Sequence, residues 1–228
     1  MKKLIILDII CYVGLPYFIW NYGRDSLGDY FAMLLSTVPG FIYTIFRFAK
    51  ERQFNIAGLF VLSSLFIGTF VNILSQNGEK MLWNQIYLGY GFAAVYLLSI
   101  LIKKPLALYF AVDFVYLQGF PREDSRKLFT EKGIFKWYQL LTGVIVIRGI
   151  VQNTLKAWLI NSYGIESYGK MLIYMQISGW IFGGLIISGY FFIGSKVNLY
   201  IKENNIVFSQ YKPDAQACIE DIPGNHLK

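Results

Sequence analysis

The segment FKWYQLLTGVIVIRGIVQNTLKAWLI, residues 135–160, decides the class of fold. An α-helix needs about 20 apolar residues to cross the hydrocarbon layer of a membrane, and this segment is long enough. A helix also pairs its backbone N–H and C=O groups internally, which hydrocarbon requires. Arg148, a permanently charged side chain, nevertheless stands near the middle of the segment. The segment therefore predicts a membrane-spanning helix whose charge needs an explanation.

The composition of the whole chain agrees with a membrane protein. Of its 228 residues 55% are hydrophobic and only 15% are charged, whereas soluble domains carry about a quarter charged residues. Apolar runs of about 20 residues recur along the chain. We predict an all-α integral membrane protein with six transmembrane helices, at approximately Leu4–Tyr22, Leu27–Phe48, Phe54–Ser75, Trp83–Ile102, Phe135–Ile160 and Met171–Gly194.

A shorter apolar segment, Leu106–Gln118, follows the fourth predicted span. As a helix it would reach only about 20 Å, so we expect a short interfacial or re-entrant helix rather than a seventh span. The charged segment REDSRK, which begins at Arg122, is compatible with another short helix or with a helical lead into the fifth span. Residues 1–201 are thus predicted to form one helical transmembrane domain, and residues 202–228 a flexible cytoplasmic tail.

The distribution of lysine and arginine predicts the orientation, because cytoplasmic loops carry an excess of both. With the N-terminus inside, the outer side holds only Arg24, Lys80, Lys156 and Lys170, and Arg148 lies within the membrane. All other basic residues lie on the inner side, so both termini are predicted to be cytoplasmic. This bias and the attraction of anionic lipids explain the net charge of +7, and we expect the lipid bilayer and no nucleic acid as a partner.

Motifs of catalysis, phosphate binding and metal binding do not occur in the sequence. It contains no glycine-rich phosphate loop, nucleophile elbow or HExxH motif. Cys11, Cys218 and the single histidine, His226, stand apart from one another and from any ligand pattern. We therefore expect no enzymatic activity, no cofactor and no metal.

Arg148 is the centre of a candidate intramembrane polar site. Gln152 and Lys156 follow it at i+4 and i+8, so the three side chains share one helical face, with Asn153 beside it. A charge near the membrane midplane costs about 3 kcal/mol on insertion scales. This face should therefore look into the helix bundle or toward water.

Two acidic residues in apolar segments, Asp8 and Asp113, complete the candidate site. Both begin nearer the cytoplasmic side, and we favour Asp113 as the ion-pair partner of Arg148, with a backbone carbonyl or a bound anion as competitors. The sequence leaves two interpretations of Arg148 equally open. Either it belongs to an ion, proton or anion pathway, or it is a structural arginine that locks helices together.

Proline and glycine mark irregular points in two of the predicted spans. Pro16 lies in the first span and Pro39-Gly40 in the second, and proline frees the carbonyl four residues earlier. Both sites are therefore predicted helix kinks. A static kink is the favoured interpretation, and a hinge is the alternative.

Small residues recur at four-residue spacing in the sixth predicted span. Gly179 and Gly183 form one such pair, and Gly184 and Ser188 form another. Small residues on one face let two membrane helices approach closely. The contact is either internal, which we favour, or between protomers of a homo-oligomer.

Four segments of the first half of the chain carry a resemblance. They are LPYFIW (15–20), STVPG (36–40), FRFAKERQFNIAGLFVLSS (46–64) and YLLSILIKKPL (96–106). Their order resembles that of bacterial inner-membrane proteins related to intracellular septation protein A, and more closely their uncharacterised multi-span relatives. The shared pattern is a proline in the first span (Pro16), a basic turn after the second (Arg47–Arg52) and a lysine-proline ending of the fourth (Ser99–Leu106). It covers roughly residues 1–110.

This resemblance implies a function without supplying site residues. It implies a non-enzymatic, multi-pass protein of the bacterial cytoplasmic (inner) membrane that acts in envelope synthesis or division through partner proteins. The family has no catalytic residues to transfer to this chain. The alternative that the residues themselves suggest is a small permease or channel with a polar path through Arg148 and Gln152.

Overall fold

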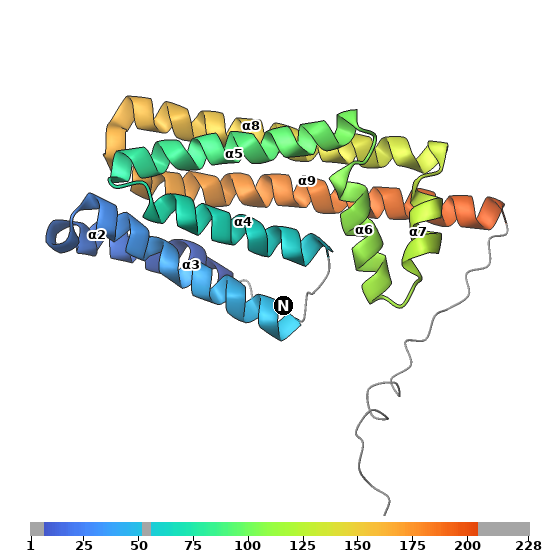
Figure 1. Cartoon of the computed structure of the whole chain (residues 1–228), viewed down its shortest axis with the longest axis horizontal. Helices are drawn as coiled ribbons and strands as arrows, with labels where there is room; N and C mark the ends of the chain where they lie inside the picture. Colours follow the sequence, from blue (N-terminus) through green and yellow to red (C-terminus); the bar gives the residue numbers. More distant parts are fainter. Residues whose placement is uncertain (1–6, 52–55, 205–228) are drawn as a thin grey trace, which may run out of the picture.

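In a computed structural model, the structure describes residues 7–51 and 56–204, and every regular element within them is helical (Figure 1). The first two elements are the π-helix η1 (Ile10–Gly14) and α2 (Leu15–Leu27). They are followed by α3 (Asp29–Glu51), α4 (Ile56–Ile73), α5 (Gly78–Leu101), α6 (Leu106–Leu117), α7 (Arg122–Phe129), α8 (Lys132–Tyr163), the 3-10 turn η2 (Gly164–Glu166) and α9 (Ser167–Glu203). The predicted all-α fold is confirmed for this part of the chain.

Within residues 7–51 and 56–204, three segments are long and apolar enough to cross a membrane. They are Asp29–Lys50, Gly78–Leu101 and Lys132–Glu203, of which the last comprises α8, η2 and α9. The apolar segments Ala57–Ile73 and Leu106–Leu117 are shorter. A membrane protein is therefore supported, but the count of six spans is not confirmed. The start of the first predicted span and residues 205–228 of the predicted tail lie outside the described residues.

The long helices lie side by side, and α6 and α7 lie crosswise to them near one end (Figure 1). Each long helix packs against the next in a closed ring, in the order α8, α5, α4, α3, α2, α9 and back to α8. The crosswise position of α6 agrees with the prediction that Leu106–Gln118 does not span. The segment REDSRK forms the first part of α7.

In the part of the chain that the structure describes, buried hydrophobic side chains form two separate clusters, one toward each end of the bundle. The first cluster joins α6 and α7 to the start of α8 and the end of α9, around Leu108, Phe129 and Tyr138. The second joins α2, α3 and α5 to the end of α8 and the start of α9, around Met33 and Leu159. Residues 146–154 of α8 belong to neither cluster. The middle of α8 thus lies between two packed ends.

Glycine lets α8 approach α5 closely at two points. A Cβ on Gly89 of α5 would lie 2.2 Å from Oδ1 of Asn153, and a Cβ on Gly149 of α8 would lie 3.1 Å from the Cβ of Ala93. Nδ2 of Asn153 donates a hydrogen bond of 2.7 Å to the carbonyl of Gly149. These contacts fix the rotation of α8 about its own axis, and therefore the direction in which Arg148 points.

The two predicted kink sites meet in space. Because Pro16 has no N–H, the carbonyl of Tyr12 lacks its α-helical partner, and the N–H of Leu15 bonds to the carbonyl of Ile10 in the wider π-helical register. Pro39 lies within α3 without ending it. The ring of Tyr12 fills the space beside Gly40, where a Cβ would lie 3.0 Å from it.

The small-residue face of α9 is not used within the described part of the chain. A Cβ on Gly179, Gly183 or Gly184 would meet no atom within 4 Å, and Ser188 is exposed. Gly189, by contrast, is in close contact with α8: a Cβ on Gly189 would lie 2.6 Å from Cδ1 of Leu141. The internal packing that we favoured for these residues is therefore not observed, because the face of α9 that meets α8 is the one that carries Ser178 and Gly189.

Replacing Gly89 by alanine is expected to destabilise the bundle. The added methyl group would force Asn153 out of its bond to Gly149, and such overpacking typically costs about 1–3 kcal/mol. Gly91→Ala is the matched control, because a Cβ at Gly91 of the same helix meets nothing within 4 Å. Thermal unfolding of both variants in mild detergent tests this, and equal melting temperatures would contradict the account of α5–α8 packing.

Candidate functional site

Arg148 lies near the middle of the longest stretch of α8 that faces neither hydrophobic cluster. It stands about 24 Å from Lys132 and about 23 Å from Tyr163 along the helix axis, at 1.5 Å per residue. Both ends of the 32-residue helix therefore extend beyond a hydrocarbon layer of about 30 Å centred on Arg148. The depth expected from the sequence fits the helix that the structure describes.

Arg148, Gln152 and Lys156 occupy the side of α8 that turns away from its exposed face. Ile147 and Trp158 represent the exposed face, with 55% and 56% of their surface accessible. The three polar side chains are only partly accessible, and the adjacent Asn153 is buried against α5. We call Arg148, Gln152 and Lys156 the basic face of α8. The prediction that this face looks into the bundle is consistent with these positions.

The neighbours of the basic face come from the two helices that flank α8. Nε2 of Gln152 donates a hydrogen bond of 3.3 Å to the hydroxyl of Ser178 on α9. Tyr96 of α5 lies close enough to experience the charge of Arg148. Gln152 and Arg148 thus point into the angle between α5 and α9.

The two cations of the basic face lack a carboxylate among residues 7–51 and 56–204. Within these ranges neither Arg148 nor Lys156 makes a hydrogen bond or an ion pair with another group. Lys156 lies about two turns before the end of α8, surrounded by protein but not sealed from solvent. The orientation count assigned Lys156 to the outer side, and it lies in the helix, as the predicted span Phe135–Ile160 already implied. The basic face is thus an electropositive surface in apolar surroundings, which attracts anions.

Asp113 does not pair with Arg148, and our preferred ion pair is wrong. Its carboxylate is 1% exposed, with Oδ1 at 3.3 Å from Nη2 of Arg122. Oδ2 accepts a hydrogen bond of 3.0 Å from the N–H of Ala57, in the first turn of α4. Because α6 lies crosswise near the end of the bundle, its acidic residue reaches α4 and α7 rather than the middle of α8.

Asp8 also lies away from Arg148. Its carboxylate accepts a hydrogen bond of 2.8 Å from the hydroxyl of Tyr43 and lies 3.6 Å from Arg47 on α3. Of the predicted site residues, Arg148, Gln152 and Asn153 therefore stay together on α8. The two aspartates take part in separate contacts between helices, near the ends of the bundle.

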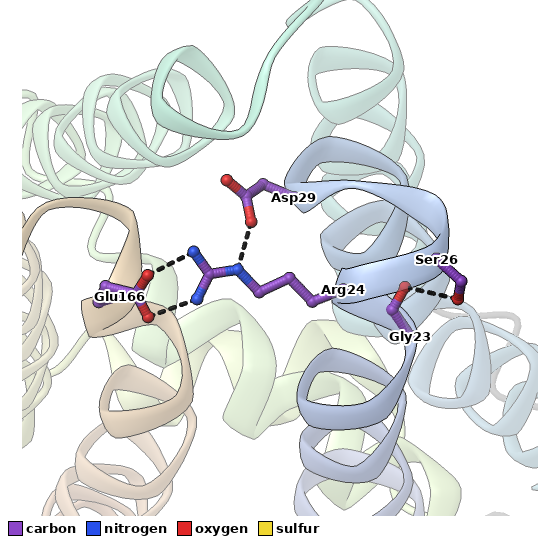
Figure 2. A network of polar contacts seen from close by, with 5 residues as sticks. All are labelled: Gly23, Arg24, Ser26, Asp29 and Glu166. Atoms are coloured by element: carbon purple, nitrogen blue, oxygen red, sulfur yellow. Dashed lines mark hydrogen bonds and ion pairs between the residues drawn. The ribbon is translucent and has the colours of Figure 1, made fainter.

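A cluster of charged residues that the sequence did not reveal joins two turns at the end of the bundle that holds Met33 and Leu159. Arg24, near the end of α2, donates hydrogen bonds to Glu166 in η2 and to Asp29 at the start of α3 (Figure 2). We call these three residues the Arg24 clamp. The bond to Glu166 is the main factor that raises the pKa of Arg24 above its ordinary value. The sequence offered one indication of the Arg24 clamp: Arg24 and Glu166 both lie near the predicted outer ends of spans.

Aromatic packing supports the Arg24 clamp from within. The guanidinium of Arg24 lies 5.1 Å from the ring of Trp20, and Trp20 packs edge-on against Tyr168 of α9. The hydroxyl of Tyr168 is 2.6 Å from that of Ser36 on α3. The clamp and the second hydrophobic cluster together close the end of the bundle that the sequence assigns to the outside.

Other chemistry is not indicated by the described residues. Within residues 7–51 and 56–204, no group of three or more His, Cys, Asp or Glu side chains could hold a metal ion. Comparisons with protein-family models, curated proteins and solved structures found no match to this chain. The resemblance to the septation protein A group accordingly stays a prediction.

Breaking the Arg24 clamp is expected to loosen the outer end of the bundle. Arg24→Gln and Glu166→Gln should each lower the melting temperature in detergent, and Arg24→Gln should lower it more because it also removes the bond to Asp29. The double variant should melt no lower than Arg24→Gln alone, since the Arg24–Glu166 interaction is already lost in that variant. Asp25→Asn is the control, because Asp25 is exposed and adjacent to Arg24. Fully additive losses in the double variant would show that the two residues act independently.

Proposed function

We propose that the protein is a small permease or channel for anions, with a polar path through Arg148 and Gln152. The observation that carries the proposal is the presence of two cations, Arg148 and Lys156, on one inward face of α8 without a carboxylate partner in the described residues. Intramembrane charges usually mark substrate or ion pathways. Two uncompensated positive charges favour an anion over a cation as the species that passes.

The contacts of Arg148 favour this role over that of a structural lock. An arginine that joins helices uses its planar fork of donors on a carboxylate or carbonyl, as Arg24 does with Glu166 and Asp29. Arg148 has no such acceptor among residues 7–51 and 56–204. Its donors remain available for an anion, and Gln152 adds an amide one turn further along the helix.

The contacts at the bundle end that holds the Arg24 clamp would block such a path. The clamp and the cluster around Met33 and Leu159 fill the end that the distribution of basic residues places outside. Passage would therefore require these contacts to separate, which is typical of a gated path rather than of an open pore.

Anion flux into proteoliposomes tests the proposal. The purified protein should conduct at least one of chloride, inorganic phosphate and lactate, and Arg148→Leu should reduce that flux about tenfold or more, as expected for losing roughly 1.4 kcal/mol of anion stabilisation. Arg148→Lys should retain part of the flux, because lysine keeps the positive charge but lacks the planar set of guanidinium donors. Lys132→Met, at the exposed start of α8, is the matched loss of one cation and should leave the flux unchanged.

The same assay can overturn the proposal. If Arg148→Leu folds normally and conducts as well as the unmodified protein, Arg148 has no part in a pathway. If the unmodified protein conducts none of the three anions, in vesicles where the reconstituted protein is folded, the permease function is wrong.

A second candidate function is favoured by the uncovered face of α9. A Cβ would meet no atom within 4 Å at three glycines of this face, Gly179, Gly183 and Gly184. Such an open face of small residues allows close packing against a helix of another protein. This supports an envelope or division component of the bacterial cytoplasmic membrane that acts through partners. A fluorescent fusion at native expression would be enriched at division sites in that case, and uniform membrane fluorescence would count against it.

A further inference from the structure

A pocket of about 780 Å³ lies between the crosswise helices α6 and α7 and the end of α9. Its volume is within the range of about 300–1,000 Å³ that is typical of ligand sites. Most of its lining is apolar and aromatic, with Phe110 and Phe114 from α6, Phe129 from α7 and Phe191 from α9. This pocket is separate from the basic face of α8, because Arg148, Gln152 and Lys156 are not among its lining residues.

The pocket also has a polar part. Gln118, Ser125 and Asn198 line it, and their side chains make no hydrogen bond with any other described residue. Ser125 is the most informative, because it is 2% exposed and lines the pocket. Its hydroxyl makes no hydrogen bond within the described part of the chain, so it can bond to a ligand or to water in the pocket. The pocket therefore combines an apolar body with polar side chains whose donors are available to a ligand.

Positive charge lies beside this polar part. Arg126 follows Ser125 in α7, is exposed, and stacks over the ring of Tyr109 at 5.5 Å. It makes no ion pair with a carboxylate within residues 7–51 and 56–204. Arg122, one turn earlier, is held by Asp113 and lies 4.1 Å from the ring of Tyr116. Arg126 does not line the pocket, but its exposed guanidinium follows Ser125 directly in the chain and is available to a headgroup that protrudes from the pocket.

We propose that the pocket binds one anionic phospholipid of the cytoplasmic leaflet. An acyl chain would lie along the aromatic lining, and the phosphate would accept hydrogen bonds from Ser125 and Arg126. The position of the pocket favours this ligand over a soluble one, because short helices that lie crosswise at one end of a membrane bundle are typical of the interface. The sequence assigns that end to the inner leaflet, where anionic headgroups meet basic residues.

Native mass spectrometry of the full-length protein in mild detergent tests this inference with defined lipids. Titration with phosphatidylglycerol and with phosphatidylcholine should show one tightly retained lipid and a preference for phosphatidylglycerol. Arg126→Gln should reduce that preference about fivefold, since one basic residue near an anionic surface contributes about that factor. Ser125→Ala should weaken retention of both lipids, because both carry a phosphate.

A pocket-filling variant with a matched control separates this site from general lipid adhesion. Gly194 lines the pocket and a Cβ there meets no atom within 4 Å, so Gly194→Leu should fold and occupy the space of the acyl chain. Gly91→Leu adds the same side chain to open space on α5, outside the pocket. Retention should fall in Gly194→Leu and stay unchanged in Gly91→Leu.

Three results would overturn the inference. The first is equal retention of lipid by the unmodified protein and Gly194→Leu, and the second is no preference for phosphatidylglycerol. The third is a dimer that Gly194→Leu abolishes while lipid retention is unchanged, which would assign the pocket to a second copy of the chain. None of these results depends on anion flux, so the test stands apart from the proposed permease function.

Discussion

A cation in the middle of a membrane helix must face protein or water, and this constraint on Arg148 governs the arrangement of α8. The contacts that meet it are steric rather than electrostatic. Gly89 of α5 accommodates Asn153, and Gly189 of α9 accommodates Leu141, so that α8 is held on two sides. The remaining side of α8 carries exposed apolar residues such as Ile147. With α8 fixed in this rotation, Arg148, Gln152 and Lys156 turn away from the exposed side.

Packing at the two ends of the bundle leaves the basic face between them. The cluster around Met33 and the Arg24 clamp close one end, and the cluster around Tyr138 binds α6 and α7 to the other. Filling the middle with a third apolar cluster would bury two cations without compensation, at a cost of several kcal/mol per ion. The gap between the two cores thus coincides with the position of Arg148 and Gln152 on α8.

The sequence predicted the features that depend on local pattern. Apolar run length gave the helical class, and the i, i+4, i+8 spacing placed Arg148, Gln152 and Lys156 on one face, because both follow from helix geometry. It did not predict contacts between helices. Asp113 binds Arg122 and the start of α4 because α6 lies crosswise, and run length carries no information on that direction. The Arg24–Glu166 contact joins residues 142 positions apart, and no local pattern marks such a pair.

The measurement that tests the inward basic face most directly is the reactivity of single cysteines toward charged thiol reagents, in a background with Cys11→Ser and Cys218→Ser. Gln152→Cys should react with an anionic methanethiosulfonate faster than with a cationic one, because Arg148 and Lys156 attract the anion. Ile147→Cys, on the exposed apolar side, should react with neither. Failure of Gln152→Cys to react, or equal rates with both reagents, would contradict an electropositive, accessible face on α8.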